Sequence, residues 1–163
     1  MKISGKTIDT LLENNWSIAT AESCTGGLLA HIITNTPGSS AYFTHGFITY
    51  SDEAKIVELD VPKTVIDQHS SYSAKVAEIM AESVRKIAKS TFGLAITGIA
   101  PPGDPNSSLE VGTAFFGIAT SRENISFDIS TSSKNREDFK NKLVKNTLDI
   151  FEGIIKRYAM SQI

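Results

Sequence analysis

Two adjacent serines, a tyrosine and a lysine within one short segment are the side chains of this sequence best suited to acyl transfer. Ser39 and Ser40 follow Pro37-Gly38, a turn signal, so we expect both hydroxyls at an exposed and conformationally restricted corner. Tyr50 and Lys55 come later in the same segment. Serine with a lysine base is an established arrangement for acyl transfer. The segment therefore predicts a hydroxyl nucleophile, a phenol and an amine within reach of one another.

The elements around these residues should bring them together. Gly46–Tyr50 is rich in β-branched and aromatic residues and predicts a strand. Ser51 is a good helix N-cap, and Lys55 follows it by one helical turn, which would return the amine toward the strand end. Commoner roles fit the same residues: Ser40 as a helix cap, Lys55 as a solvated charge and Tyr50 as an aromatic at the core edge.

A second segment rich in hydroxyl groups and glycine lies between a predicted strand at 16–20 and a predicted helix at 28–33. It contains Ser23, Thr25, Gly26 and Gly27. A helix N-terminus offers free N–H groups and a positive dipole, and glycine lets an anion approach closely, so a phosphate could bind here. Alternatively, Ser23 only caps the helix and the glycines only permit close packing.

The remaining patterns predict a mixed α/β fold. Ser73 should cap a long amphipathic helix, and the apolar run Phe92–Thr97 fits a strand buried on both faces of a sheet. A loop rich in Pro and Gly follows at 98–108. Two strands, Val111–Ala119 and Ile125–Ser130, are then expected to form a hairpin before a last helix from about residue 134. The hairpin requires at least one antiparallel pair in an otherwise mainly parallel sheet.

Composition excludes several classes of function. With 163 residues, 40% hydrophobic and 21% charged, the chain has the size and balance of one globular domain. A net charge of −2 gives no reason to expect a nucleic-acid partner, and no apolar run is long enough for a membrane span. The single Cys24 excludes an intrachain disulfide, and no convincing set of metal ligands is present. A reducing, cytoplasmic setting is the default expectation.

Five motifs taken together resemble one known family. In chain order they are Ala21-Glu22-Ser23-Cys24-Thr25-Gly26-Gly27, Pro37-Gly38-Ser39-Ser40, Gly46-Phe47-Ile48-Thr49-Tyr50-Ser51-Asp52-Glu53-Ala54-Lys55, Thr97-Gly98-Ile99-Ala100 and Val111-Gly112-Thr113. Their order is similar to that of the CinA C-terminal-domain family, whose members are nicotinamide mononucleotide deamidases, also called nicotinamide-nucleotide amidohydrolases. Each motif alone is weak, but five in register are specific and span nearly the whole chain.

The resemblance implies a three-layer α/β/α sandwich with a mixed, mainly parallel five-stranded sheet. It implies a single CinA C-terminal-like domain over residues 1–163, in the stand-alone form. The implied reaction is hydrolysis of the carboxamide of nicotinamide mononucleotide to nicotinate mononucleotide and ammonia, a step of pyridine nucleotide salvage and NAD metabolism. No cofactor is required, the substrate is a small nucleotide, and a homodimer is expected.

Matched motif by motif, the resemblance also implies roles for single residues. Ser40 would be the nucleophile, Lys55 its general base and Tyr50 a helper in the proton network. Lys55 would need a pKa far below that of a free lysine, which burial could supply. Backbone N–H groups near Ser40 would hold the oxyanion. The positions expected at the substrate are Ser23, Thr25, Gly26, Gly27, Ser39, Thr97 and Arg136.

Two stretches depart from the family pattern, and both fall near the expected substrate pocket. The turn before the long helix, usually Gly-Ala-Val-Ser, is Ser70-Ser71-Tyr72-Ser73 here. Pro101–Pro105 replaces a glycine-rich loop, and Leu109-Glu110 stands where Lys-Pro is usual. Two alternatives to a deamidase of nicotinamide mononucleotide therefore stay open: a Ser/Lys amidase acting on another small amide, and a non-catalytic nucleotide-binding module of the same fold.

Overall fold

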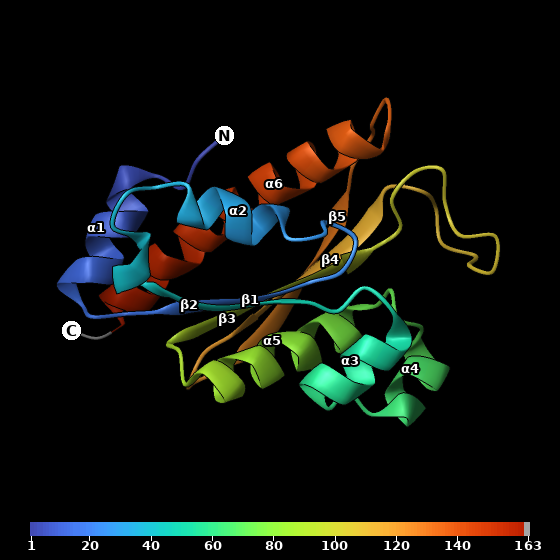
Figure 1. The fold of residues 1–163 in the computed structure, drawn as a ribbon, viewed down its shortest axis with the longest axis horizontal. Coiled ribbons are helices and arrows are strands. Elements are labelled where there is room, and N and C mark those ends of the chain that lie inside the picture. The colour runs from blue at the N-terminus through green and yellow to red at the C-terminus, as the bar shows by residue number, and fades with distance from the viewer. Residues whose placement is uncertain (162–163) are drawn as a thin grey trace.

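A five-stranded sheet forms the middle layer of the molecule, with helices on both faces (Figure 1). The computed structural model describes residues 1–161. The strands lie in the order β2-β1-β3-β4-β5. Their bounds are β1 (Ile18–Glu22), β2 (Phe43–Ile48), β3 (Phe92–Gly98), β4 (Thr113–Ala119) and β5 (Asn124–Ser130). Four strands run in one direction and β4 opposes them, so two neighbouring pairs are parallel and two are antiparallel.

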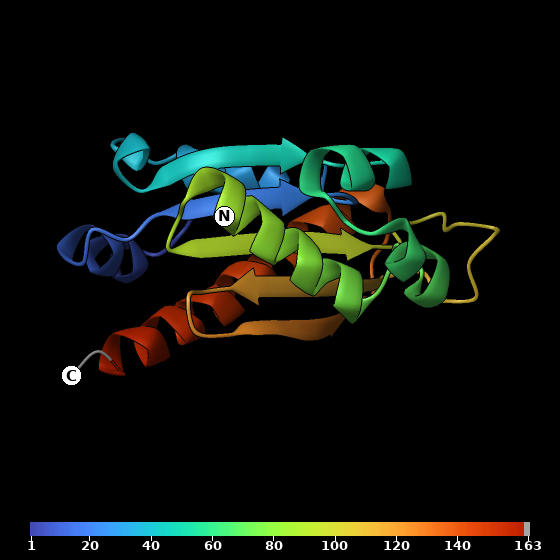
Figure 2. The same ribbon diagram turned by 90° about the horizontal axis from the view of Figure 1, so that it is seen from below.

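Helices α1, α2 and α6 cover one face of the sheet, and α3, α4 and α5 lie on the other (Figures 1 and 2). Their bounds are α1 (Gly5–Glu13), α2 (Leu28–Thr34), α3 (Asp52–Leu59), α4 (Lys63–His69), α5 (Ala74–Ala88) and α6 (Arg136–Met160), with a short 3-10 helix at Ser39–Ala41. The expected α/β/α sandwich is confirmed. Half of the strand pairings are nevertheless antiparallel, because β4 belongs to a hairpin and also pairs with β3.

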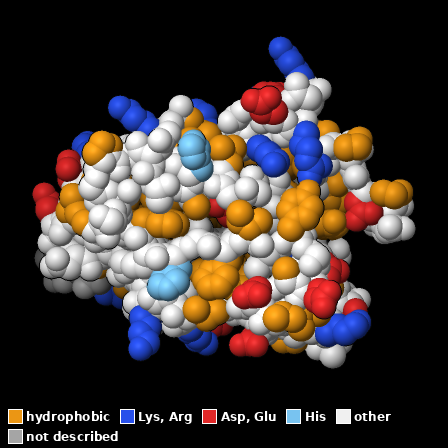
Figure 3. All heavy atoms as spheres, in the orientation of Figure 1, with side chains coloured by type: hydrophobic (Ala, Val, Ile, Leu, Met, Phe, Trp, Pro, Cys, Tyr) orange, Lys and Arg blue, Asp and Glu red, His pale blue; other side chains and the backbone are white. Residues whose placement is uncertain are grey.

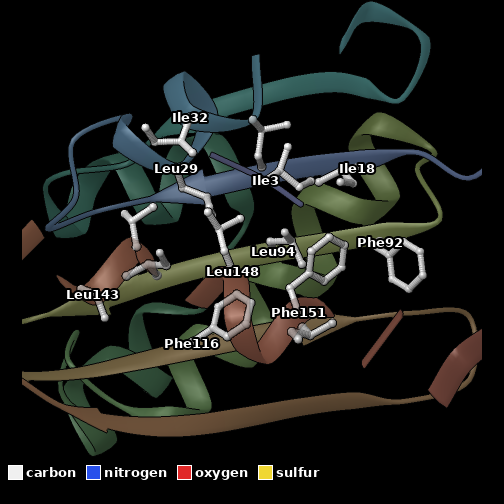
Figure 4. Close-up of a cluster of buried hydrophobic side chains, with 14 of the residues drawn as sticks. Ile3, Ile18, Leu29, Ile32, Phe92, Leu94, Phe116, Leu143, Leu148 and Phe151 are labelled. Atoms are coloured by element: carbon white, nitrogen blue, oxygen red, sulfur yellow. The ribbon is translucent and has the colours of Figure 1, made fainter. Parts of the chain in front are cut away.

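The larger hydrophobic core lies between the sheet and helices α2 and α6. Leu29 of α2, Leu94 of β3 and Phe116 of β4 point into it together with Leu143 and Phe151 of α6 (Figure 4). Full burial of each such side chain stabilises the fold by roughly 1.5–3 kcal/mol. This core holds β1, β3 and β4 in place from one side of the sheet.

A second core packs α5 against the opposite face of the sheet. Val76, Met80 and Val84 of α5 are fully buried there, together with Ala19 of β1 and Ala95 of β3. Small residues on the strands let the helix approach closely. The sheet is therefore covered on both sides, as its continuous apolar central strands indicated.

Local signals explain most of the element boundaries. Ser51 Oγ accepts a hydrogen bond from the Ala54 N–H at 3.0 Å and begins α3, and Ser73 Oγ accepts from the Val76 N–H and begins α5. The expected strand at 46–50 is displaced, because β2 starts at Phe43 and ends before Thr49. This shift removes Tyr50 from the sheet and places the start of α3 beside the end of β1.

Charged side chains are interspersed on the face of the molecule drawn in Figure 3, with acidic and basic groups mixed and apolar groups between them. Within residues 1–161, no helix has both the length and the apolar character needed to cross a lipid bilayer.

Candidate active site

The carboxyl-terminal ends of β1 and β3 open into a cavity of about 220 Å³. Crevices at such strand ends are the usual ligand sites of open α/β sheets. Its walls come from five parts of the chain: the turn after β1, the segment after β2, the turn before α5, the end of β3 with the loop that follows it, and the start of α6. The lining residues are Ser23, Cys24, Tyr50, Tyr72, Gly98, Ile99, Ala100, Gly103, Asp104, Pro105 and Arg136.

Lys55 lies beneath this cavity and is completely buried. Its Nζ lies 3.3 Å from Ser23 Oγ, 3.2 Å from the Thr49 carbonyl oxygen and 3.5 Å from the Ser51 carbonyl oxygen. All three partners are uncharged oxygens, and no carboxylate lies within ion-pair distance of Nζ among the described residues. The amine is therefore held by hydrogen bonds alone.

Burial lowers the pKa of the Lys55 ammonium from its usual value of 10.5, because the charged form loses its hydration. The negative charge of Asp52, in the first turn of α3, opposes this and raises the pKa. Desolvation is the larger effect. Burial thus acts in the direction that a lysine base needs, because it favours the neutral amine over the ammonium.

Ser23 is the hydroxyl that meets this amine. The Ser23 N–H donates to the Ile96 carbonyl of β3 at 2.9 Å, and the Thr49 N–H donates to the Glu22 carbonyl at 2.9 Å. These two bonds fix the end of β1 against β3 on one side and against the segment after β2 on the other. Ser23 is itself buried, with its side chain between Lys55 and the cavity. A serine with a buried lysine base can act as a nucleophile toward an amide or ester.

Ser40 does not lie near Lys55, so the expected proximity of these two residues is wrong within one chain. Ser40 sits in the 3-10 helix before β2, and Lys55 follows β2. The six residues of β2, at roughly 3.3 Å per residue, separate the two by about 20 Å. Ser40 is exposed, and the neighbouring Ser39 Oγ donates to the Thr34 carbonyl at 3.2 Å. Both serines lie where β2 begins, at the end of the sheet opposite to the cavity.

At the start of α2, where a phosphate was expected to bind, a buried carboxylate already accepts hydrogen bonds from the backbone N–H groups. Glu22 accepts hydrogen bonds from Thr25 Oγ1 at 2.6 Å and from the Gly27 N–H at 3.2 Å. It further accepts from the N–H groups of Leu29 at 3.0 Å and Ala30 at 2.8 Å. The free donors that an anion would use are therefore taken, and the negative charge would repel a phosphate. The Gly26 N–H bonds to Ser23 within the turn.

Tyr50 and Arg136 do lie together at the mouth of the cavity. The Tyr50 hydroxyl is hydrogen-bonded to the Arg136 guanidinium, which also donates to the Pro101 carbonyl at 3.0 Å. Arg136 is the first residue of α6, so its positive charge sits where the helix dipole is also positive. This makes the mouth of the cavity favourable to an anionic group. Arg136 and Tyr50 therefore remain candidates for contact with a ligand.

Thr97 is fully buried and is not part of the cavity wall. Its Oγ1 donates to the Ser71 carbonyl at 2.8 Å, and the Ser71 hydroxyl is hydrogen-bonded to Asp52. Thr97 thus fastens the turn before α5 to β3, which positions the wall rather than touching its contents. Among residues 1–161, no group of three or more His, Cys, Asp or Glu side chains is arranged to hold a metal ion.

The sequence contained a signal for Ser23 that pointed to binding rather than to catalysis. Ser23 directly follows a strand and precedes a helix, the position at which an α/β sheet exposes a side chain at its carboxyl edge. The neighbouring Cys24 is buried, and burial raises the pKa of its thiol to about 12. Cys24 is therefore an uncharged thiol at ordinary pH and a poor nucleophile.

The fold and this cavity define a class: a three-layer α/β/α protein with a serine and a buried lysine at the carboxyl edge of its sheet. The model of the family described as "CinA C-terminal domain" matches residues 1–155. The chain belongs to the CinA C-terminal domain family.

Relatives and solved structures agree with this assignment. A "CinA-like protein" of Geotalea uraniireducens is 45% identical over 122 residues, covering 72% of this chain and 29% of the relative. A relative from Caldanaerobacter subterraneus subsp. tengcongensis, named as competence-damage inducible, is 40% identical over 151 residues, covering 93% and 35%. The chain thus spans only about a third of the length of such curated relatives.

Two crystal structures share the fold over nearly their whole length. A competence or damage-inducible protein from Enterobacter asburiae superposes with a TM-score of 0.88 at 26% identity, covering 92% of this chain and 94% of that one. A CinA superfamily protein from Klebsiella pneumoniae 700603 gives a TM-score of 0.89 at 24% identity, covering 93% and 94%. The latter identity supports the fold alone.

Proposed function

We propose that this chain is an amidohydrolase that converts nicotinamide mononucleotide to nicotinate mononucleotide and ammonia, with Ser23 as nucleophile and Lys55 as general base. The observation that carries the proposal is the fully buried Lys55 amine, 3.3 Å from a serine hydroxyl on the wall of the cavity. The family resemblance supplies the substrate. On the same basis, we propose that the protein acts in pyridine nucleotide salvage and forms a homodimer.

In the first half of the reaction, the neutral Lys55 amine removes the proton of Ser23 as Oγ attacks the carboxamide carbon. The C–O bond forms and a tetrahedral oxyanion results. Lys55, now an ammonium, returns the proton to the amide nitrogen, the C–N bond breaks, and ammonia leaves. The product of this half is an ester between Ser23 and the nicotinoyl group.

In the second half, water takes the place of the serine. Lys55 accepts a proton from water, hydroxide adds to the ester carbon, and the C–O bond to Ser23 breaks as Lys55 returns the proton to Oγ. One proton of the water molecule thus ends on the Ser23 hydroxyl, and the remaining hydroxide becomes part of the new carboxyl group. The enzyme is restored with its amine neutral.

Two further contacts complete the proposal. The oxyanion needs hydrogen-bond donors, and the backbone N–H groups of Cys24 and Thr25 directly follow the nucleophile. Within residues 1–161, neither N–H has another residue as its acceptor. The phosphate of the nucleotide would meet the Arg136 guanidinium at the mouth of the cavity, since Glu22 closes the start of α2 to anions.

The test is an assay of ammonia and nicotinate mononucleotide released from nicotinamide mononucleotide by the purified chain. We expect both products in equal amounts, and a loss of roughly a thousandfold or more in Ser23→Ala and in Lys55→Ala. Ser40→Ala is the matched control, because it also removes a serine hydroxyl, but at the end of the sheet far from the cavity. This variant should retain full turnover. Circular dichroism verifies that each variant is folded.

Each other outcome rejects a definite part of the proposal. Full turnover by Ser23→Ala would remove Ser23 from the chemistry, and loss of turnover in Ser40→Ala alone would return the nucleophile to the corner before β2. Ammonia released only from unrelated amides would identify an amidase of another substrate. Binding of the nucleotide without any turnover, unchanged in Lys55→Ala, would identify a non-catalytic binding module.

A further inference from the structure

Tyr72 and Asp104 form a polar pair on one wall of the cavity. The Tyr72 hydroxyl donates to Asp104 Oδ2 at 3.0 Å, and the Asn106 N–H donates to Asp104 Oδ1 at 2.9 Å. Both side chains are half-buried and line the same cavity as Ser23. They come from segments 32 residues apart, the turn before α5 and the loop after β3. These are the two stretches singled out in the sequence for their unusual residues.

The pair presents only hydrogen-bond acceptors and negative charge to the cavity. Burial and the neighbouring Asp104 raise the pKa of the Tyr72 phenol to about 12, so its proton remains in place and is directed at the carboxylate. The phenol oxygen keeps acceptor capacity, and each carboxylate oxygen has a further lone pair. A ligand group that meets this wall gains by carrying a positive charge.

The same cavity is also lined by a cation. Arg136 lines the mouth, while Asp104 is the one carboxylate among the lining residues. A ligand of suitable polarity would carry an anionic group and a positively charged group at separate points. The charges of the cavity thus describe a dipolar ligand rather than a simple anion.

We propose that Tyr72 and Asp104 form a specificity element that selects a carboxamide carried on a positively charged ring over the uncharged form of the same ring. This inference rests on the proposed function, because it assigns a substrate preference to the Ser23–Lys55 site. Asp104 supplies the charge, and Tyr72 holds the carboxylate in position. Neither residue takes part in bond making.

The experiment compares two substrates in wild type and variants. One is a pyridinium-3-carboxamide nucleotide, and the other is its uncharged 1,4-dihydro form, which has the same sugar, phosphate and amide. The measured quantity is the ratio of kcat/KM for the two substrates. Asp104→Asn preserves the shape of the side chain and removes its charge. The matched control is Asp9→Asn, which makes the same change at an exposed position of α1.

We expect Asp104→Asn to lower the ratio by about fivefold, the size typical of a partly exposed charge pair, with turnover of the dihydro form nearly unchanged. Tyr72→Phe should lower the ratio in the same direction by a smaller factor. Asp9→Asn should leave it unchanged. An unchanged ratio in Asp104→Asn, whether kcat/KM falls equally for both substrates or for neither, would overturn the inference. The Ser23–Lys55 chemistry would remain intact.

Failure of the proposed function gives a different result, because wild type would then release ammonia from neither substrate. Calorimetric binding of the two nucleotides still tests the pair in that case. Tighter binding of the pyridinium form, lost in Asp104→Asn, would support the specificity element, and equal binding of both forms would reject it.

Discussion

A buried lysine with only neutral oxygens around its amine is the unusual residue of this molecule. Lysine is almost never fully buried without a charged partner, because its ammonium is strongly hydrated. Lys55 meets Ser23 Oγ and two backbone carbonyl oxygens instead. These groups satisfy the donors of an amine without neutralising a full positive charge. The surroundings therefore suit the form of lysine that accepts a proton.

This arrangement predicts an acid limb in the pH dependence of kcat/KM. Below the lowered pKa of Lys55 the amine is protonated and cannot act as a base, so activity should fall tenfold for each pH unit. The midpoint of that limb should lie below 10.5, the usual value for lysine. Asp52→Asn removes the charge that raises the pKa of Lys55, so its limb should move to lower pH. A profile without an acid limb, or a limb moved upward in Asp52→Asn, would contradict lysine as the base.

At the scale of elements, the closeness of α5 to the sheet decides how the cavity wall is placed. Gly93 of β3 and Gly117 of β4 face the backbone of α5, and a Cβ on Gly117 would lie 2.2 Å from the Ala77 carbonyl oxygen. Real Cβ atoms do not approach an oxygen so closely. The start of α5 follows directly on the turn that carries Tyr72, so the two glycines also set the position of that wall.

We therefore expect Gly117→Ala to destabilise the protein by about 1–3 kcal/mol, the usual cost of forcing extra volume into a packed interface. Gly153→Ala is the matched control, since Gly153 is exposed on α6 and a Cβ there meets nothing within 4 Å. That change should stabilise by about 0.5–1 kcal/mol, because alanine favours the helix. Urea unfolding midpoints measure both. Equal stability of the two variants would show that α5 can move away from the sheet without loss.

At the scale of the whole molecule, the sequence predicted the helices, the strands and the layers. It did not predict which residues come together at the carboxyl-terminal ends of the strands. Ser51 and Ser73 act as the expected caps, and the buried strand and the hairpin occur where their patterns indicated. These features depend on neighbours in sequence. The pairing of Lys55 with Ser23 depends on β1 and β2 being adjacent and parallel, a contact across 32 residues.

Local sequence could not decide between the two serine-containing turns. Ser40 is nearer to Lys55 along the chain. Strand β2 lies between them, however, and places the two residues at opposite ends of the sheet. The role of Glu22 was hidden for a similar reason. Its carboxylate turns back onto the helix that follows it, so a segment typical of an anion site contains its own anion.

At the scale of the whole fold, the buried Lys55 lowers the stability of the protein wherever the unfolded chain would carry this lysine protonated. Between the lowered pKa of Lys55 in the folded state and 10.5, the unfolded chain binds more protons, so Lys55 makes stability rise with pH in that window. Lys55→Met removes this term. We expect the variant to be inactive, to gain about 1–2 kcal/mol near neutral pH, and to lose that advantage progressively as the pH approaches 10.5.

Denaturant unfolding from pH 6 to 10 measures the difference, with Lys145→Met, on the exposed face of α6, as the control that should show no such trend. A Lys55→Met variant less stable than wild type at neutral pH would mean that the amine stabilises the fold instead of opposing it.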